Sequence, residues 1–401
     1  MPGTRAIVIG SGIGGLTAAV ALHRNGRRVT VLERADSLEP VGAGIGLAPN
    51  AQRALDVIGL GDEIRGLAAW QGDGGLYTPG GRRLVRVNSG AFAERFGGPL
   101  VLLHRAQLIE RLAARLPDGT IRTGCPAEVT DPGAPDGRPA RVATPGGELE
   151  AELVVGADGI HSAVRRALFP AHPGPSYCGF TAWRTVVPAP AAPFRPHETW
   201  GPGMIWGSQP LKDGRVYAYA AAHLPAGGHL GDPAAEKAEL LRRFGGWHHP
   251  IPAILAAAEP ERILRNDVHH LIDPLPAFHR GRTALVGDAA HAMAPNLGQG
   301  GNQAIEDAIV LAHHTAPGTD LAGALAAYSA DRLPRTTGIV RRAARVARVQ
   351  SLRSAPAAAV RAGLLTAGAA LAPGAAVRAF DGIADWRPPV RTYADRAQQG
   401  T

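Results

Sequence analysis

The segment that decides the fold runs from Arg5 to Glu33 and reads RAIVIGSGIGGLTAAVALHRNGRRVTVLE. It opens with a short apolar run at residues 5–9, which is typical of a buried strand. Closely spaced glycines follow, and then an alanine-rich helical pattern at residues 16–25 that ends at a glycine. A second strand is predicted at residues 28–32. This order of strand, glycine turn, helix and strand predicts the first unit of a parallel α/β fold.

The glycines of this turn indicate what the unit binds. Gly10 permits the tight turn, Gly12 lets a pyrophosphate approach the backbone, and Gly15 lets the helix pack closely on the strand. The free N–H groups of the helix N-terminus then face the phosphates. Glu33, 18 residues beyond Gly15, lies where an acid binds the ribose hydroxyls. The dinucleotide site predicted from this unit comprises Gly10, Gly12, Gly14, Gly15, Glu33 and Arg34.

Length and composition exclude some classes of protein. The chain has 401 residues, 45% hydrophobic and 19% charged, which is typical of a globular protein of about two domains. The formal net charge is +8, but Lys212 and Lys237 are the only lysines and the arginines are spread along the chain. A surface that follows nucleic-acid phosphates needs a basic cluster, so we expect no nucleic-acid partner.

Cysteine usage and the apolar tail bear on the compartment. Cys125 and Cys178 have no metal-ligand or CxxC spacing, which is typical of a reducing, cytoplasmic protein. The most apolar segment, residues 355–380, is interrupted by arginine and proline. Such a segment is too broken to span a bilayer, so we expect no integral membrane association.

Three later motifs place polar side chains at the starts of helices or the ends of strands. Arg105 heads a helical pattern, Asp158 follows the buried strand at residues 153–156, and Asp288 follows the strand at residues 283–286. Ligands of parallel α/β sheets bind outside the carboxyl ends of the strands. The two acids are therefore expected beside the dinucleotide, although each is also a possible helix cap, and Asp158 could serve both roles.

The stretch after Asp288 loosens the backbone between two regular elements. Residues 295–302 read PNLGQGGN, and they precede an amphipathic helix that buries its apolar side chains at three- and four-residue spacing. Glycines let backbone amides approach a ligand closely. A helix N-terminus carries about half a positive charge, which favours an anionic or reduced group there.

Taken together, these motifs resemble the flavoprotein monooxygenases of the aromatic hydroxylase type, the para-hydroxybenzoate hydroxylase-like family. The glycine turn with Glu33-Arg34, Gly-Ala-Asp158-Gly and Gly-Asp288 occur in the order of that family. Residues 41–50, VGAGIGLAPN, resemble its loop beside the flavin. The resemblance covers the chain to about residue 347 and implies non-covalent FAD, with residues 295–302 beneath the isoalloxazine ring. The further FAD-binding residues that it implies are Gly46, Arg105, Val129, Asp158, Asp288, Pro295, Gly298, Gly300, Gly301 and Asn302.

The same resemblance implies the chemistry. In that family NADPH or NADH reduces the flavin, and reduced flavin and O2 form a C4a-hydroperoxide that hydroxylates an electron-rich ring. The protein supplies orientation and exclusion of water. The expected partner is an aromatic or polyketide-like small molecule, and the expected state is a monomer or homodimer.

The fold expected from these features is α/β, with a Rossmann-like FAD-binding domain, an inserted and mainly antiparallel β-sheet substrate domain, and C-terminal helices. We assign residues 1–170 and 276–347 to the FAD-binding domain, residues 171–275 to the substrate domain, and residues 348–401 to the C-terminal helical segment.

The inserted sheet supplies the candidate pocket. Residues 180–187, 204–209 and 215–221 alternate in the manner of strands. Alternation places Tyr217 and Tyr219 on one face, and Trp183 and Arg184 on opposite faces. The catalytic candidates are Tyr217, Arg184 and His223. The substrate-pocket candidates are Met204, Trp206, Tyr219 and Asn296.

Several other functions remain open at this stage. An epoxidase or a Baeyer-Villiger-type oxygenase would use the same flavin scaffold, and a flavin-binding protein without turnover would show the same motifs. A flavin halogenase would need a lysine near the flavin, but Lys212 and Lys237 lie outside the flavin motifs. A nicotinamide-only dehydrogenase would leave Asp158 and Asp288 unexplained.

Histidines invite a metal interpretation that the spacing does not support. His269, His270 and His291 have no acid or further histidine at ligand spacing, so we predict no metal site, with His291 packed at a helix start. Within the family, urate hydroxylases resemble this chain but have an acid and an arginine where Asn296 and Met204 stand. This difference favours a flatter, more apolar aromatic substrate.

Overall fold

The computed structural model describes residues 4–38, 43–70, 72–135, 137–228 and 230–389. Its first layer is a six-stranded sheet in the order β18-β19-β12-β1-β2-β8. The strands from β19 to β8 are parallel, and β18 pairs antiparallel with β19 at the edge. The strands are β1 (Arg5–Ile9), β2 (Arg28–Leu32), β8 (Ile121–Arg122), β12 (Leu153–Gly156), β18 (His279–Arg280) and β19 (Thr283–Leu285). The predicted parallel unit around the first glycine turn is confirmed.

Helices cover this sheet and close the first core. Helix α1 (Ile13–Arg24) packs on α10 (Gly300–His314), and both contribute to the large apolar cluster around β1 and β12. The other helices of this region are α2 (Pro49–Val57), α3 (Gly61–Leu67), α5 (Arg105–Ala113), α6 (Ala163–Leu168) and α9 (Asp288–His291), with the 3-10 turn η2 (Pro295–Leu297). Helix α9 begins directly after β19, so its first residue stands at the carboxyl end of the sheet.

The second layer is a seven-stranded sheet in the order β17-β13-β16-β15-β14-β5-β6. Its strands are β5 (Gly74–Tyr77), β6 (Arg83–Val87), β13 (Ser176–Pro188), β14 (His197–Gly201), β15 (Met204–Pro210), β16 (Arg215–Ala222) and β17 (Leu264–His270). All neighbours are antiparallel except β14 and β5. The three strands predicted within residues 180–221 are confirmed. The sheet extends beyond residues 171–275, because β5 and β6 come from the segment assigned to the first domain, and the domain boundaries stay a prediction.

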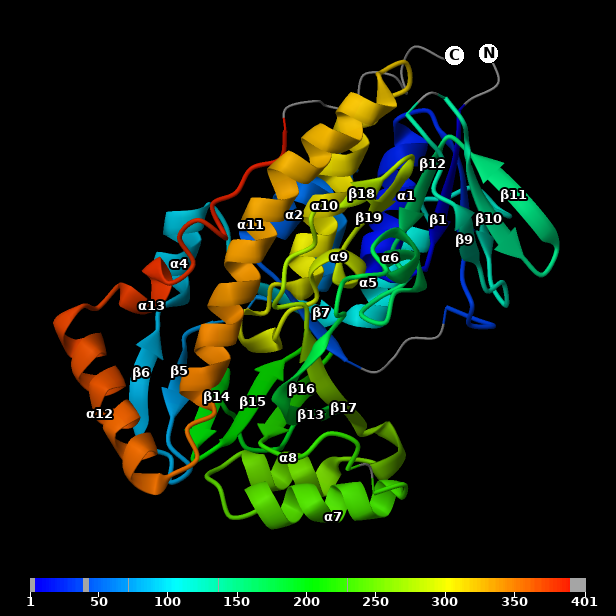
Figure 1. The fold of residues 1–401 in the computed structure, drawn as a ribbon. Helices are drawn as coiled ribbons and strands as arrows, with labels where there is room; N and C mark the ends of the chain where they lie inside the picture. The colour runs from blue at the N-terminus through cyan, green and yellow to red at the C-terminus, as the bar shows by residue number, and fades with distance from the viewer. Residues whose placement is uncertain (1–3, 39–42, 71, 136, 229, 390–401) are drawn as a thin grey trace.

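The seven-stranded sheet is covered on both faces. Helices α7 (Pro233–Phe244) and α8 (Ile251–Ala257) lie beneath one face, as Figure 1 shows, and close a core with Trp183 and Trp206. The other face meets Met293, Ala294 and the long helix α11 (Leu321–Gln350) in a separate apolar cluster.

Smaller elements complete the molecule. A three-stranded sheet joins β3 (Gly44–Leu47), β7 (Val101–His104) and β4 (Ala69–Trp70). A second contains β9 (Glu128–Asp131), β10 (Ala140–Thr144) and β11 (Gly147–Ala151). The remaining elements are α4 (Ser89–Phe96), η1 (Pro260–Arg262), α12 (Ala355–Leu371) and α13 (Ala375–Arg378). Helix α12 lies along β6 at the edge of the seven-stranded sheet (Figure 1), which confirms C-terminal helices.

Candidate active site

The first glycine turn is built for close backbone approach. Gly10 has φ +105°, and a Cβ there would lie 2.5 Å from the carbonyl oxygen of Ala157. A Cβ on Gly15 would lie 2.0 Å from the carbonyl oxygen of Gly10. Either side chain would force the turn open, so both positions require glycine. At Gly12 no described heavy atom lies within 4 Å of a built Cβ, which leaves open space at the helix N-terminus.

Gly14, which is predicted to bind the cofactor, also lies where two helices meet. A Cβ there would lie 3.1 Å from Cβ of Ala304, because α1 and α10 cross at this point. This glycine therefore serves helix packing, and the contact between the two helices was not visible in the sequence.

Glu33 is held in place by the turn that it follows. Its carboxylate accepts hydrogen bonds from Ser11 N at 2.8 Å, Ser11 Oγ at 2.6 Å and Ala35 N at 2.9 Å. Burial alone would raise the pKa of Glu33, but these bonds outweigh burial and lower it. The acid is thus a fixed anion beside the glycine turn, while the neighbouring Arg34 is exposed.

Asp158 serves the start of a helix. One carboxylate oxygen accepts from Ser162 Oγ at 2.5 Å and the other from Val164 N at 3.1 Å, at the N-terminus of α6. The sequence left cofactor binding and helix capping open for this acid. The structure shows its carboxylate engaged in capping.

From its exposure and its desolvation we infer that Asp288 faces an open space, here called the hollow, that it shares with Arg105 and Arg184. Its side chain is exposed, yet the surrounding protein raises its pKa by desolvation, against the opposing charges of His291, Arg105 and Arg184. A side chain can be both accessible to solvent and desolvated by the protein around it when it lines an internal space. Burial likewise lowers the pKa of Arg105, whose backbone N–H donates to Ala43 O at 2.9 Å. One acid and two arginines from three different elements therefore border the same space.

A buried polar cluster supports the turn that carries Asp288. Asp307 accepts from Gly287 N at 2.8 Å, contacts His291 Nε2 at 2.5 Å and accepts from Arg332 Nε at 2.7 Å. Arg332 also donates to Glu306 at 2.6 Å. His291 thus packs at a helix start, as predicted. This cluster was not predicted from the sequence, although Glu306 and Asp307 come soon after the glycine-rich loop.

The glycine-rich loop is fastened to β3 by one side chain. Asn302 donates to Gly46 O at 2.9 Å and to Gly298 O at 2.8 Å, and accepts from Ala48 N at 2.9 Å. A Cβ on Gly301 would lie 2.8 Å from Ile45 Cδ1. The Asn302 side chain is therefore committed to protein, so it holds two loops in register. Of the related loop at residues 41–50, positions 41 and 42 lie outside the described residues.

The seven-stranded sheet presents two tyrosines to the hollow. Their ring centroids lie 5.7 Å apart, which places Tyr217 and Tyr219 on one face as predicted. A Cβ on Gly44 of β3 would lie 2.6 Å from the Tyr217 ring, so this tyrosine packs directly on the loop beside the glycine-rich segment. Arg184 is the cross-strand neighbour of Tyr219 and acts electrostatically on both Tyr217 and Asp288. Arg184 therefore connects the tyrosines of the sheet with the acid at the start of α9.

The chain matches the family model described as FAD binding domain over residues 3–343. It belongs to the FAD-dependent aromatic monooxygenases. It is 38% identical over 349 residues to the aurachin C monooxygenase/isomerase of Stigmatella aurantiaca, covering 86% of this chain and 90% of that protein. It is 33% identical over 355 residues to an FAD-dependent urate hydroxylase of Klebsiella oxytoca, covering 84% and 88%. The crystal structure of Klebsiella pneumoniae HpxO complexed with FAD and uric acid aligns with a TM-score of 0.83 at 28% identity, covering 94% of this chain and 97% of that chain.

The residues of this monooxygenase fit FAD. The open helix N-terminus at Gly12 and the fixed acid Glu33 suit the phosphates and the ribose, and the hollow beside Asp288 and Arg105 suits the rest of the cofactor. NAD(P)H and O2 are the co-substrates typical of this family. When bound, reduced FAD activates O2 for transfer to an aromatic ring. Val129, also predicted to bind FAD, lies partly buried in β9.

Two predicted pocket residues of the monooxygenase lie on the wrong face of the sheet. The Trp206 side chain is 1% exposed, its ring centroid lies 5.5 Å from that of Phe244, and its Nε1 donates to Ser208 Oγ at 2.8 Å. Met204 packs against the same cluster beneath the sheet. Side chains alternate along a strand, so Ile205 and Gln209 of β15 face the tyrosines instead. The prediction was wrong because both faces of this sheet are covered by protein.

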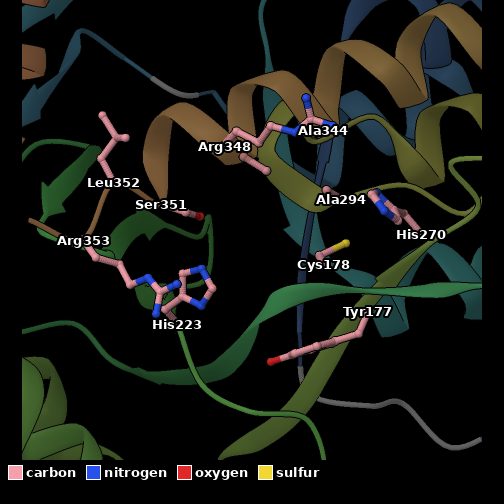
Figure 2. A pocket seen from close by; sticks show the side chains of 11 residues that line it. Tyr177, Cys178, His223, His270, Ala294, Ala344, Arg348, Ser351, Leu352 and Arg353 are labelled. Atoms are coloured by element: carbon pink, nitrogen blue, oxygen red, sulfur yellow. The ribbon is translucent and has the colours of Figure 1, made fainter. Parts of the chain in front are cut away.

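A cavity of about 500 Å³ opens beside the glycine-rich loop. Ala294, the residue before Pro295, lines it together with Cys178, and burial raises the pKa of this thiol to about 12. Figure 2 shows His223 beside Arg353, with Arg348 on α11. The sequence placed His223 with Tyr217 as a catalytic candidate, but the structure places it in this cavity, near the end of β16.

Asn296 belongs to the glycine-rich loop and is fastened to α11. Its side-chain amide donates to Gln350 Oε1 at the end of α11, and its own Oδ1 is buried without a hydrogen-bond partner among the described residues. A buried acceptor without a donor is costly, which is consistent with a group that a ligand satisfies.

The described residues contain no group of three or more histidine, cysteine or acidic side chains that could hold a metal ion. No single described helix is long and apolar enough to cross a membrane, and α11 with α12 passes the same test only as a pair bent by 118°.

Proposed function

We propose that this monooxygenase hydroxylates a small aromatic compound with an acidic or strongly polarised oxygen substituent, of the kind found among natural-product intermediates. The observation that carries this proposal is the cavity of about 500 Å³ next to Pro295. Its volume lies in the usual range for small-ligand pockets, roughly 300–1,000 Å³. It adjoins the loop that the resemblance places beneath the isoalloxazine ring.

The lining of the cavity supports an anionic substrate. Arg348, Arg353, His223 and His270 line it, and no carboxylate occurs among its described lining residues. Arg353 lowers the pKa of His223 and Arg348 lowers that of His270, in both cases in addition to burial. A cavity with this field raises the local concentration of phenolates and carboxylates.

We assign roles to the site residues within the same proposal. Gly10, Gly12 and Glu33 hold the adenosine diphosphate half of FAD, and Arg105 and Asp288 hold the remainder. The backbone of residues 295–302 seats the flavin ring. Tyr217, Tyr219 and Arg184 face the substrate from the sheet. We also infer that the enzyme works in the cytoplasm, as a monomer or homodimer; Cys125 and Cys178, both free thiols, support a reducing compartment.

The proposal is tested by anaerobic stopped-flow absorbance with NADH or NADPH and a panel of hydroxybenzoates, hydroxyquinolines and urate, followed by an oxygen pulse. We expect an anionic aromatic to accelerate flavin bleaching and to yield a hydroxylated product. A bound flavin that never bleaches would support a flavin-binding protein without turnover. An epoxide or ester product would support the alternative oxygenase chemistries.

The cavity itself is tested by two arginine substitutions. Arg348→Gln should raise the KM for an anionic aromatic about tenfold, which is the loss of one charge-assisted contact. Arg345→Gln is the matched control, since Arg345 is exposed on the same helix and does not line the cavity. Equal KM values for the two variants would remove the cavity from the substrate path.

A further inference from the structure

Glu198 is a carboxyl group on the face of the seven-stranded sheet that meets the hollow, and the sequence analysis did not single it out. The Tyr219 hydroxyl donates to Glu198 Oε1, and Trp200 Nε1 donates to Glu198 Oε2 at 2.9 Å. Among the described residues, no arginine, lysine or histidine forms an ion pair with it within 4.0 Å. A desolvated acid without a cationic partner is uncommon unless it has a function.

Gly207 is what lets this pair form. Strand β15 separates β14 from β16, and Glu198, Gly207 and Tyr219 lie in one cross-strand row. A Cβ on Gly207 would lie 2.1 Å from Tyr219 Cζ and 2.5 Å from its hydroxyl oxygen. The tyrosine side chain therefore crosses the strand directly over this position. Any side chain at residue 207 would block the crossing, so the glycine is required for close approach.

The position of Tyr219 along β16 places the pair between the loop at Gly44 and the cluster that borders the cavity. On one side of it, Tyr217 packs on Gly44 beside the flavin loop. On the other side, Ala221 packs against the cluster that contains Met293 and Ala294. Tyr219 thus faces the space between these two walls. Tyr219 and Glu198 are both partly accessible, although the surrounding protein raises the pKa of each by desolvation.

Within the pair, Glu198 is the group that changes its protonation state, as its surroundings show. Tyr217 and Arg184 lie beside Tyr219 on β16 and β13, and Gln209 of β15 also acts on the Tyr219 hydroxyl. Leu76 is the neighbour of Glu198 on β5, and Trp200 separates the acid from Arg361, whose guanidinium carbon lies 5.5 Å from the indole centroid. Because the pKa of Tyr219 lies well above its usual value, its hydroxyl transmits a proton without resting as a tyrosinate.

We propose that Tyr219 and Glu198 form the proton-accepting pair for the aromatic substrate. The substrate O–H or ring N–H bond breaks and its proton bonds to the Tyr219 oxygen, while the Tyr219 proton moves to Glu198. The substrate becomes its anion and Glu198 becomes a carboxylic acid, with no change in oxidation state. Tyr219 touches the substrate and Glu198 acts through it. This inference rests on the proposed function.

A proton-accepting pair would assist hydroxylation of the substrate ring. Removal of the proton makes the ring a better nucleophile toward activated oxygen, and a base is most effective when its pKa approaches the working pH. Desolvation moves the pKa of the Glu198 carboxyl in that direction. The partly accessible side chain can return the proton to water between turnovers.

The test compares wild type with Glu198→Gln and Tyr219→Phe in single-turnover hydroxylation across pH, using a phenolic substrate and a fluorinated analogue with a more acidic hydroxyl. In both variants we expect product formation below the pKa of the phenol to fall about 100-fold. The acid limb should move up to the pKa of the phenol itself, and the fluorinated analogue should restore most of the rate. Flavin reduction by NAD(P)H in the absence of the aromatic substrate is measured alongside, so that an effect on the hydroxylation step is separated from an effect on the flavin.

Two further variants separate this role from a structural one. Glu236→Gln is the matched control: this buried acid also accepts a tryptophan N–H, from Trp183 at 2.9 Å, but on the opposite face of the sheet. Its pH profile should match wild type. Gly207→Ala keeps Tyr219 and Glu198 but prevents the Tyr219 ring from passing over strand β15. It should therefore shift the pH profile in the way expected of Glu198→Gln, and it tests the pair independently if Glu198→Gln does not fold.

The outcomes are distinct. Unchanged profiles in folded Tyr219→Phe and Gly207→Ala, with wild type active, would overturn the proton-accepting pair and leave the proposed function in place. A wild-type enzyme that reduces its flavin but hydroxylates none of the aromatics would overturn the proposed function and this inference with it.

Discussion

At the scale of single residues, a side chain in this enzyme acquires its role from what surrounds it. Asp158 and Asp288 both follow buried strands of the same sheet. The first is satisfied by the N-terminus of α6, whereas the second faces a hollow bordered by Arg105 and Arg184. Two acids with the same sequence signature thus have different surroundings, because among the described residues a hydrogen bond from a helix amide is found for Asp158 and not for Asp288.

Asp288 gives the first prediction. Asp288→Asn removes the charge that faces Arg105 and Arg184, and the hollow then holds two cations without their acid. We expect FAD affinity to fall by about 2–4 kcal/mol, the usual cost of breaking a desolvated charge pair. The measurement is the visible absorbance of bound flavin during dialysis. Asp118→Asn, at an exposed site, is the control, and a variant that stays as yellow as wild type would remove Asp288 from the cofactor site.

At the scale of elements, buried polar contacts fix how helices meet the site. The cluster around Asp307 joins α10, α11 and the turn before α9 through Arg332 and Gly287. The side chains of Asp307 and Arg332 are fully buried, at 0% and 1% exposure. The turn that presents Asp288 is thereby attached to the two longest helices that cover the site.

Asp307 gives a prediction with a pH dependence. Burial opposes its ionisation, but His291 and Arg332 outweigh burial and lower the pKa of Asp307 to about 2. A depressed pKa stabilises the folded state above the unfolded value of about 4, and this stabilisation is lost as pH falls through about 2. Asp307→Asn should therefore cost about 3–5 kcal/mol at pH 7, with the difference narrowing below pH 4. Urea unfolding at pH 7 and pH 3 measures this, and a pH-independent difference would contradict it. Asp331→Asn, in an exposed pair with His314, should change stability little.

Arg361 gives a second prediction at this scale. Its guanidinium donates to Gln350 O at 2.7 Å and Val349 O at 3.1 Å at the end of α11, and to Gly201 O at 3.0 Å on β14. Arg361→Ala leaves these carbonyls without their donor, so we expect a loss of roughly 2–4 kcal/mol in unfolding free energy. Arg361→Lys should recover little, because lysine lacks the planar fork. Leu364→Gln, at a side chain 69% exposed on the same helix, is the control for denaturant unfolding.

At the scale of the whole molecule, the seven-stranded sheet is assembled from distant parts of the chain. The seven-stranded sheet takes β5 and β6 from residues 74–87 and its remaining strands from residues 176–270. Helix α12 then packs along β6 (Figure 1). The sheet and the helix at its edge are therefore complete only when three sequence segments have folded together.

This assembly predicts that residues 171–275 do not fold alone. The isolated segment would lack β5, β6 and the helices that cover the inner face, which exposes apolar surface and an open strand edge. We expect it to aggregate or to show no cooperative unfolding by circular dichroism. The whole chain should unfold in one transition, and a well-folded isolated segment would show that the sheet is an independent domain.

The sequence by itself determined what depends on short-range geometry. A βαβ unit, its glycine turn and the acid at the end of β2 are encoded within 29 residues, from Arg5 to Glu33, because turn sterics and hydrophobic period act locally. The family, the cofactor and the strands around Tyr217 followed from motifs of this kind. The placement of Tyr217 and Tyr219 on one face also followed, since residues i and i+2 of a strand point to the same face.

Only the tertiary structure decided what depends on which surfaces meet. Alternation along β15 separates Ile205 from Trp206 but does not say which of them faces the site, because apolar cores lie on both sides of the sheet. The Glu198–Tyr219 pair requires the register of three strands and a glycine between them, and neither is written in local sequence. Contacts between residues far apart in the chain are set by the packing of whole elements, and they decide which side chains of the sheet share a face with Tyr219.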